Sequence, residues 1–273
     1  MKTKSYFFNF TSVAAALLLT ACGSSNKAAD SNVQSTQPEE QQFDYQALLE
    51  KTVEGEIPGV ALYIDSPTFK FHGAAGVANI DSQTPMQIDA RIPNGSAGKK
   101  LTALLASMLV NDQQLDLDKP ITTYLPTDIT SRVANAEAIT TRQMLQHTAG
   151  LFDYLNESDG AFYDSVLKEP DSIKTDTFAM SFAYGQSANF APATDWSYSN
   201  TGYILTGLIL DELLAEHHSK AMRQKIFEPF GLDSMSYGGV EKDFASINSG
   251  YFLYEGELID TKLYYQNIGV ADA

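Results

Sequence analysis

A serine that precedes a lysine by three residues can supply a nucleophile, because the amine can take the proton that keeps a serine hydroxyl unreactive. This spacing occurs three times, at Ser24/Lys27, Ser96/Lys99 and Ser165/Lys168. Ser24 lies in a polar stretch without rigid support, and no strong helical pattern follows Ser165. Ser96 begins the most amphipathic helical pattern of the chain, and we therefore expect it to be the reactive serine.

Helix geometry explains how Lys99 would serve Ser96. Three residues make nearly one turn, so Lys99 lies about 4.5 Å further along the axis on the same face. A free lysine, with a pKa of about 10.4, is protonated at neutral pH. Burial near the positive end of a helix disfavours an ammonium ion, and the same helix end offers N–H groups to a developing oxyanion. Lys100 is the competing amine, and we expect it to be solvated.

Other catalytic patterns are weaker. A tyrosine followed two residues later by an asparagine occurs three times, and spacing alone does not choose among Tyr154/Asn156, Tyr198/Asn200 and Tyr265/Asn267. The nucleophile elbow Gly-x-Ser-x-Gly is broken around Ser96, because Asn94 stands where its first glycine belongs.

The histidines form no compact metal-binding motif such as His-Glu-x-x-His. The chain has four of them, His72, His147, His217 and His218. We expect His147 to be a structural residue at a helix end, and His217 and His218 to be solvated. The single cysteine excludes a Cys-rich metal site and an intramolecular disulfide. The sequence thus predicts no metal and no cofactor.

Residue periodicity predicts the elements that would position Ser96. A short amphipathic helix over 43–53 precedes two strand-like runs at 59–64 and 69–77, which a turn signal joins as a hairpin. The chain then becomes helical, with helices expected at 96–109, 141–147, 204–213 and 219–230. Two strands followed by a long helical stretch predict an α+β fold with helices packed on a sheet.

Composition narrows the possible partners. The 273 residues include 18 Lys and Arg against 34 Asp and Glu, for a net charge of −16. Phosphates would repel such a chain, so we expect no nucleic-acid partner.

The N-terminus has the features of an export signal. Lys2 and Lys4 precede a mostly apolar run, 6–21, which is too short to span a bilayer. Its exit, Leu-Thr-Ala-Cys, resembles a bacterial lipobox, which implies a signal peptide over 1–21 and a lipid on Cys22. Residues 22–42 are polar and predict a flexible tether, and 43–273 would be the domain. Gly23 after the cysteine implies, by the same resemblance, an outer-membrane anchor that faces the periplasm.

Several blocks of sequence resemble a known family in its order and roughly its spacing. They are Gly95-Ser-Ala-Gly-Lys-Lys-Leu-Thr-Ala103, Leu115-Asp-Leu-Asp-Lys-Pro120, Tyr124-Leu-Pro126, Met144-Leu-Gln-His-Thr-Ala-Gly-Leu151, Trp196-Ser-Tyr-Ser-Asn-Thr-Gly-Tyr203 and Glu228-Pro-Phe-Gly-Leu232. This pattern is similar to the serine β-lactamase-like family of class C β-lactamases, DD-carboxypeptidases and related esterases. The resemblance implies a β-lactamase/transpeptidase-like fold: a sheet with flanking helices, a helical subdomain, and the site between them.

The resemblance also assigns roles. It implies that Ser96 is acylated, that Lys99 is its base or proton relay, that Tyr198 passes a proton to the leaving group, and that Asn200 positions Lys99 and the substrate amide. The implied reaction is acyl transfer to water from an amide, a β-lactam or an ester. The implied substrate is a small molecule or a peptidoglycan peptide, and these alternatives stay open.

The family's third motif, Lys-Thr-Gly or His-x-Gly, does not occur in these residues. The end at 267–273 resembles the approach to the family's last helices and strands, so we expect an incomplete domain that lacks its C-terminal strands. Such a fragment is expected to be poorly soluble and inactive. Two rival interpretations are a non-catalytic cell-envelope binding protein on the same scaffold and an unrelated secreted esterase.

Overall fold

The computed structural model describes residues 43–241, 247–254 and 256–271. The predicted signal peptide, the tether at 22–42 and Cys22 lie outside the described residues. The helices are α1 (Tyr45–Thr52), α2 (Lys99–Asn111), α3 (Thr127–Thr130), α4 (Thr141–Leu145), α5 (Ala161–Lys168), α6 (Asp176–Met180), α7 (Asn200–Leu214), α8 (His218–Met222) and α9 (Lys262–Asn267). The strands are β1 (Gly59–Asp65), β2 (Lys70–Asn79), β3 (Thr84–Pro85), β4 (Lys174–Thr175), β5 (Tyr251–Tyr254), β6 (Glu257–Asp260) and β7 (Ile268–Gly269).

The predicted hairpin is confirmed. β1 and β2 pair antiparallel from Gly59↔Gly76 to Asp65↔Lys70, and the short β3 extends this sheet beyond β2. The turn closes where the N–H of Ser66 donates to the carbonyl of Phe69 at 2.9 Å. Helix α1 packs on β2. The ring of Tyr45 lies 5.3 Å from that of Phe71 on β2 and 5.2 Å from that of Phe69, which directly precedes the strand.

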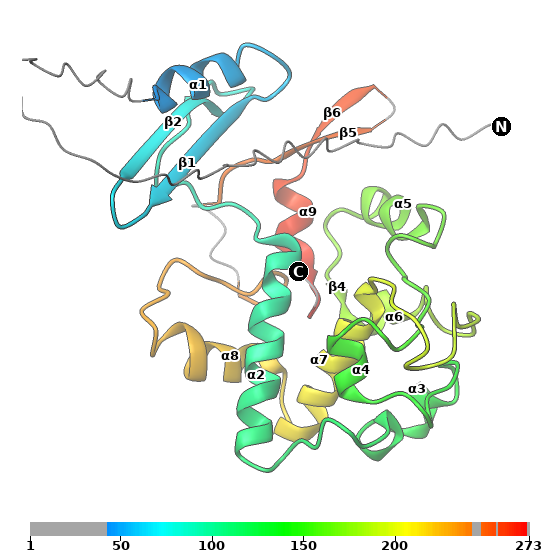
Figure 1. Ribbon diagram of the computed structural model, residues 1–273. Coiled ribbons are helices and arrows are strands. Elements are labelled where there is room, and N and C mark those ends of the chain that lie inside the picture. Colours follow the sequence, from blue (N-terminus) through cyan, green and yellow to red (C-terminus); the bar gives the residue numbers. More distant parts are fainter. Residues whose placement is uncertain (1–42, 242–246, 255, 272–273) are drawn as a thin grey trace, which may run out of the picture. The chain divides into compact units, whose positions relative to one another are not determined.

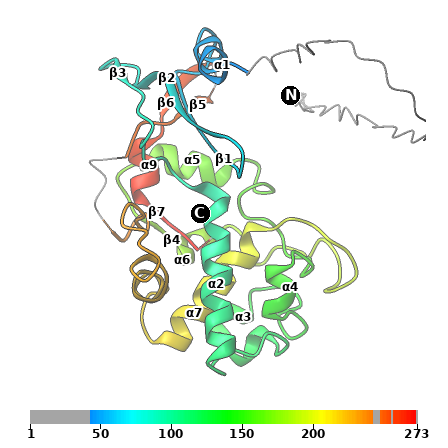
Figure 2. The same ribbon diagram turned by 60° about the vertical axis from the view of Figure 1, so that its left-hand side comes forward.

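Helices α2 and α7 lie side by side at the centre of the helical part (Figures 1 and 2). Leu105 and Leu109 of α2 and Ile204, Leu205 and Ile209 of α7 are all 0% exposed. Ten of the 15 residues of α7 are buried, as expected for a helix that is apolar on every side. Burial of each large aliphatic side chain contributes roughly 1.5–3 kcal/mol to the free energy of unfolding. The packed helix pair therefore holds the residues at the helix ends in fixed positions.

Strands β5, β6 and β7, near the end of the described residues, take part in two small sheets. β4 and β7 pair in parallel through Lys174↔Ile268 and Thr175↔Gly269, and β5 and β6 form an antiparallel hairpin. Beyond β7, the N–H of Ala271 donates to Asp176 Oδ1 at 2.8 Å and its carbonyl accepts from Thr102 Oγ1 at 2.7 Å. This last segment therefore joins α6 to α2.

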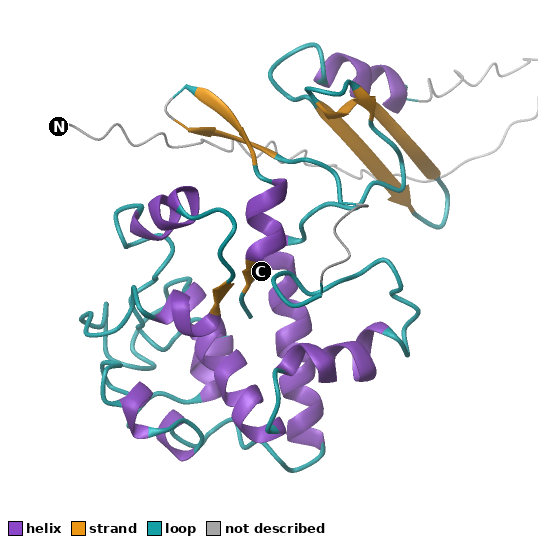
Figure 3. Ribbon diagram, turned by 180° about the vertical axis from the view of Figure 1, so that it is seen from behind, coloured by secondary structure: helices purple, strands orange, loops and turns teal. Residues whose placement is uncertain are grey.

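The α+β expectation is confirmed. Within the described ranges, however, the strands form three separate small sheets, and most helices pack on one another (Figure 3). The helix expected at 219–230 is shorter, since α8 gives way to a wider π-type turn over Arg223–Phe227. In the part of the chain that the structure describes, no helix combines the length and apolar character needed to cross a bilayer.

Candidate active site

The structure joins Ser96, Lys99 and Asn200 in one hydrogen-bonded group. Ser96 is exposed in the 3₁₀ turn Gly95–Gly98, which leads directly into α2. Gly95 adopts a φ of +55°, a left-handed conformation that glycine reaches without steric cost. Lys99 is only 5% exposed, and its Nζ lies 3.3 Å from Ser96 Oγ and 2.8 Å from Asn200 Oδ1. The predicted pair of nucleophile and amine is thus within contact.

Asp153 holds Asn200 in this group, although the sequence did not single out this residue. Its carboxylate is 2% exposed and accepts the Nδ2 amide of Asn200 at 3.0 Å from each oxygen. The N–H of Leu155 and the side chain of Asn156 also donate to it, at 3.0 Å and 2.6 Å. Because the Asn200 amide donates to Asp153, its carbonyl oxygen must turn toward Lys99. The only signal in the sequence was proximity to the block that ends at Leu151.

Tyr198 lies beside the amine of Lys99. The Nζ of Lys99 is 5.3 Å from the centre of the Tyr198 ring, and that ring stacks on His147 at 4.4 Å. The Nδ1 of His147 accepts the N–H of Ser199, at 3.2 Å, and the φ of His147 is +60°, at the end of α4. The structural role expected for His147 is therefore confirmed, and its ring also positions the tyrosine.

Burial keeps His147 neutral. Desolvation lowers the pKa of the imidazole below its ordinary value of 6.5, and the charge of Lys99 acts in the same direction. A neutral ring can accept the N–H of Ser199 at Nδ1. The ring of Tyr203 lies 5.5 Å from that of His147, and burial raises the pKa of its phenol, which keeps the hydroxyl protonated.

The competing pairs are not assembled in this way. Lys100 is exposed, as expected. Tyr154 is buried at 1% exposure, and the side chain of Asn156 is held by Asp153. Asn267 donates to the carbonyl oxygens of Pro170 and Leu263. The pair Ser24/Lys27 lies outside the described residues.

An apolar pocket of about 300 Å³ opens beside Ser96. Ser96 and Asn200 lie on its wall. The rest of the wall is mainly aromatic and aliphatic, and includes Tyr154, Phe162, Val166, Leu167, Ile259 and Tyr264. A nucleophile at the edge of such a pocket can react with a substrate whose apolar part is buried there.

The expectation that His217 and His218 are solvated is wrong. His218 is 0% exposed, because α8 packs on α7 and the ring lies between Asp211 and Tyr237, 2.7 Å from each. His217 is half-buried rather than solvated. Local spacing did not reveal this burial, since the partners of these residues come from other elements.

Asp153→Asn is expected to lower kcat by about 10- to 100-fold with little change in KM, on any substrate that the protein turns over. An amide at this position keeps one acceptor oxygen, but its NH₂ group replaces the other and meets the donor of either Leu155 or Asn156 as well as that of Asn200. Asn200 would then be held less firmly toward Lys99. Asp159→Asn, an exposed neighbour, is the matched control and should keep full activity. Unchanged kcat in a folded Asp153→Asn protein, judged by its melting temperature, would contradict this positioning role.

The chain is similar to known proteins. The family model described as Beta-lactamase matches residues 45–253. The chain is 26% identical over 175 residues to penicillin-binding protein 4* of Bacillus subtilis, covering 64% of this chain and 37% of that protein. It is 28% identical over 207 residues to the esterase EstB of Burkholderia gladioli, covering 74% and 51%.

The fold is also similar to that of a solved enzyme structure. The D-amino acid amidase of Ochrobactrum anthropi SV3, complexed with L-phenylalanine amide, matches with a TM-score of 0.65 and 26% identity, covering 81% of this chain and 61% of that one. The chain thus spans about half the length of the two curated relatives or less.

Proposed function

The chain belongs to the beta-lactamase family and has the β-lactamase/transpeptidase-like fold, and from this premise we propose that it hydrolyses an ester or amide through an acyl-enzyme on Ser96. Members of this family are serine hydrolases. The observation that carries the proposal is the contact of Ser96 Oγ with the buried amine of Lys99 at the edge of the apolar pocket.

The proposed reaction has two halves. In the first, Ser96 Oγ bonds to the acyl carbon while its proton passes to Lys99, and the bond to the leaving group breaks as that group gains a proton through Tyr198. In the second, water attacks the acyl carbon, and Ser96 leaves as a hydroxyl. Asn200 and Asp153 hold the amine of Lys99 within reach of the serine throughout.

The apolar pocket favours a substrate with a bulky apolar or aromatic acyl part. Polar side chains are few on its wall, so a small polar dipeptide would leave much of it unfilled. The similar esterase supports ester hydrolysis, and the similar amidase, complexed with L-phenylalanine amide, supports an aromatic amide. A peptidoglycan peptide or a β-lactam, suggested by the similar penicillin-binding protein, is the second candidate.

In the whole protein we expect kcat/KM on p-nitrophenyl esters to rise roughly 15-fold from the butyrate to the hexanoate, which adds two methylenes. Each buried methylene contributes about 0.8 kcal/mol, or roughly a factor of four. Leu167→Asn places an amide in the pocket wall and should remove most of this gain, while Leu258→Asn, an exposed leucine outside the pocket, should keep it. Equal kcat/KM on both esters would contradict the pocket assignment.

A non-catalytic binding protein is the remaining rival. It would bind a penicillin or ester reversibly and form no bond to Ser96. Mass spectrometry of the protein after incubation with an activated ester distinguishes the two, because only the hydrolase gains the mass of the acyl group on the peptide that contains Ser96.

A further inference from the structure

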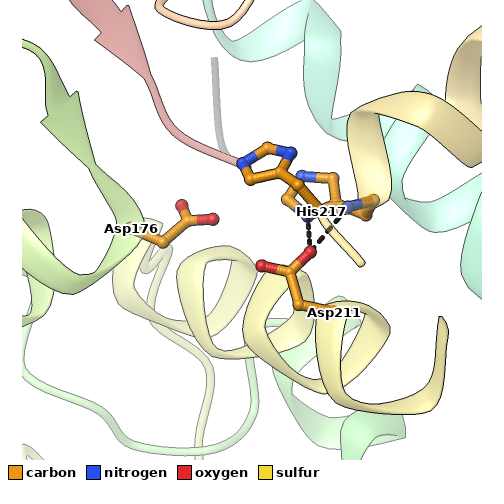
Figure 4. Close-up of side chains that lie close together, drawn as sticks. Asp176, Asp211 and His217 are labelled. Atoms are coloured by element: carbon orange, nitrogen blue, oxygen red, sulfur yellow. Dashed lines mark hydrogen bonds and ion pairs between the residues drawn. The ribbon is translucent and has the colours of Figure 1, made fainter. Parts of the chain in front are cut away.

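Four side chains that can bind a metal ion lie together near the C-terminal end of α7, whereas Asn200 lies at its N-terminal end. They are Asp176 at the start of α6, Asp211 in the last turns of α7, and His217 and His218 at the start of α8. One ligand atom from each lies within 4.8 Å of all the others. Figure 4 shows the carboxylates of Asp176 and Asp211 and the ring of His217 around one space. Asp176 and His218 are buried, and the other two are half-buried.

Gly207 of α7 provides room for this cluster. A Cβ at this position would lie 3.1 Å from Asp176 Oδ2, 3.1 Å from His218 Cε1 and 2.4 Å from the Cβ of Ala271. Any side chain here would therefore fill the gap across which the carboxylate of α6 and the imidazole of α8 approach each other. The absence of a side chain at Gly207 therefore allows Asp176, His218 and Ala271 to pack closely against α7.

Neighbouring groups hold the ligands in place. The N–H of Ala271 donates to Asp176 Oδ1, at 2.8 Å, and the N–H of His218 donates to Asp211 Oδ1, at 2.6 Å. The hydrogen bonds of His217 among the described residues involve Nδ1, and its Nε2 is then the ligand atom. Outer contacts of this kind orient metal ligands in proteins.

We propose that Asp176, Asp211, His217 and His218 bind one divalent transition-metal ion, with Zn²⁺ as the best match. Two imidazoles and two carboxylates suit Zn²⁺, whereas Ca²⁺ and Mg²⁺ prefer oxygen ligands alone. The two carboxylates also balance the charge of the ion. Bonds of about 2.1 Å place tetrahedral ligand atoms about 3.4 Å apart, so the cluster contracts slightly on binding.

Besides this contraction, binding requires a change of tautomer at His218. Its Nδ1 lies 2.7 Å from Asp211 Oδ1, and its Nε2 lies 2.7 Å from the hydroxyl of Tyr237. With the ion bound, Nδ1 takes the metal and the ring proton moves to Nε2, which donates to the hydroxyl oxygen of Tyr237. The imidazole stays neutral, and no proton is released from it.

The ion would tie together the elements behind the active site. It joins α6, α7 and α8, and through Asp176 it reaches Ala271, whose carbonyl accepts from Thr102 of α2. Thr102 lies one turn after Lys99. The role of the metal is thus to stabilise the scaffold, and the proposal is independent of the reaction at Ser96.

The test uses the full chain, dialysed against chelator and then supplied with ZnCl₂. We expect about one Zn²⁺ per chain by elemental analysis, and a melting temperature raised by about 5 °C or more when Zn²⁺ exceeds its Kd a hundredfold. His217→Ala and Asp176→Asn should each lose most of the bound Zn²⁺ and of the shift. His72→Ala, an exposed histidine on β2, is the control and should keep both.

Co²⁺ in place of Zn²⁺ tests the wild-type chain without any variant. A site of two histidines and two carboxylates should give visible absorption bands stronger than those of aqueous Co²⁺, and added Zn²⁺ should remove them. Absence of these bands, or equal Zn²⁺ binding by His217→Ala and the wild type, would overturn the proposal.

Discussion

In the whole protein, Ser96→Ala is expected to abolish covalent labelling by activated esters and by fluorescent penicillins, and to lower hydrolysis by a factor on the order of 10⁴ to 10⁶. The methyl group leaves no atom that can bond to the acyl carbon. The serine is exposed, so its replacement should change the free energy of unfolding by less than about 0.5 kcal/mol. Loss of labelling in a protein with an unchanged melting temperature would therefore report on chemistry alone.

Ser165→Ala is the matched control for this variant. Ser165 precedes Lys168 by the same three residues, and both lie on α5. Ser165→Ala should be labelled like the wild type. Labelling that persists in Ser96→Ala and disappears in Ser165→Ala would show that the wrong serine was assigned.

Lys99→Ala is expected to lower the rate of acylation by about 10²- to 10⁴-fold, the usual contribution of a general base. Its amine is the group that contacts both Ser96 Oγ and Asn200 Oδ1. Lys99→Arg should be nearly as inactive, because a guanidinium keeps the positive charge but does not give up its proton near neutral pH. Stopped-flow measurement of the rate of acylation would give these values.

A variant of the neighbouring Lys100 distinguishes an effect of the position of the amine from an effect of its charge. Lys100→Ala removes the same charge from an exposed position and should change the rate of acylation by no more than about twofold. Normal acylation by Lys99→Arg would show that Lys99 acts through its charge alone. Full loss in Lys100→Ala would mean that the base had been misidentified.

The sequence predicted the parts of the site that are encoded locally. Ser96 and Lys99 lie one turn apart, so helical periodicity places them together before any tertiary structure is known. Asn200 came only from the resemblance, because its spacing to Tyr198 is shared by two other pairs. Its contact with Lys99 spans 101 residues of sequence, and no periodicity reports on such a contact.

Asp153 and His218 were missed for the same reason. Asp153 becomes part of the site only when the loop after α4 meets the start of α7, and nothing in its own neighbours marks it. His218 was expected in water because the residues around it are polar, yet α7 and Tyr237 enclose its ring. Burial that depends on a partner element cannot be inferred from a local window of sequence.

The hydrogen bond between Lys99 and Asn200 has a consequence for the order of folding. Its two ends lie 101 residues apart, so the pair forms only after a large loop has closed and α7 has docked on α2. Contacts of such high sequence separation form slowly and late. A newly made or partly unfolded chain therefore carries an unactivated serine, and reactivity toward an acyl probe should return during refolding together with the last step of tertiary packing.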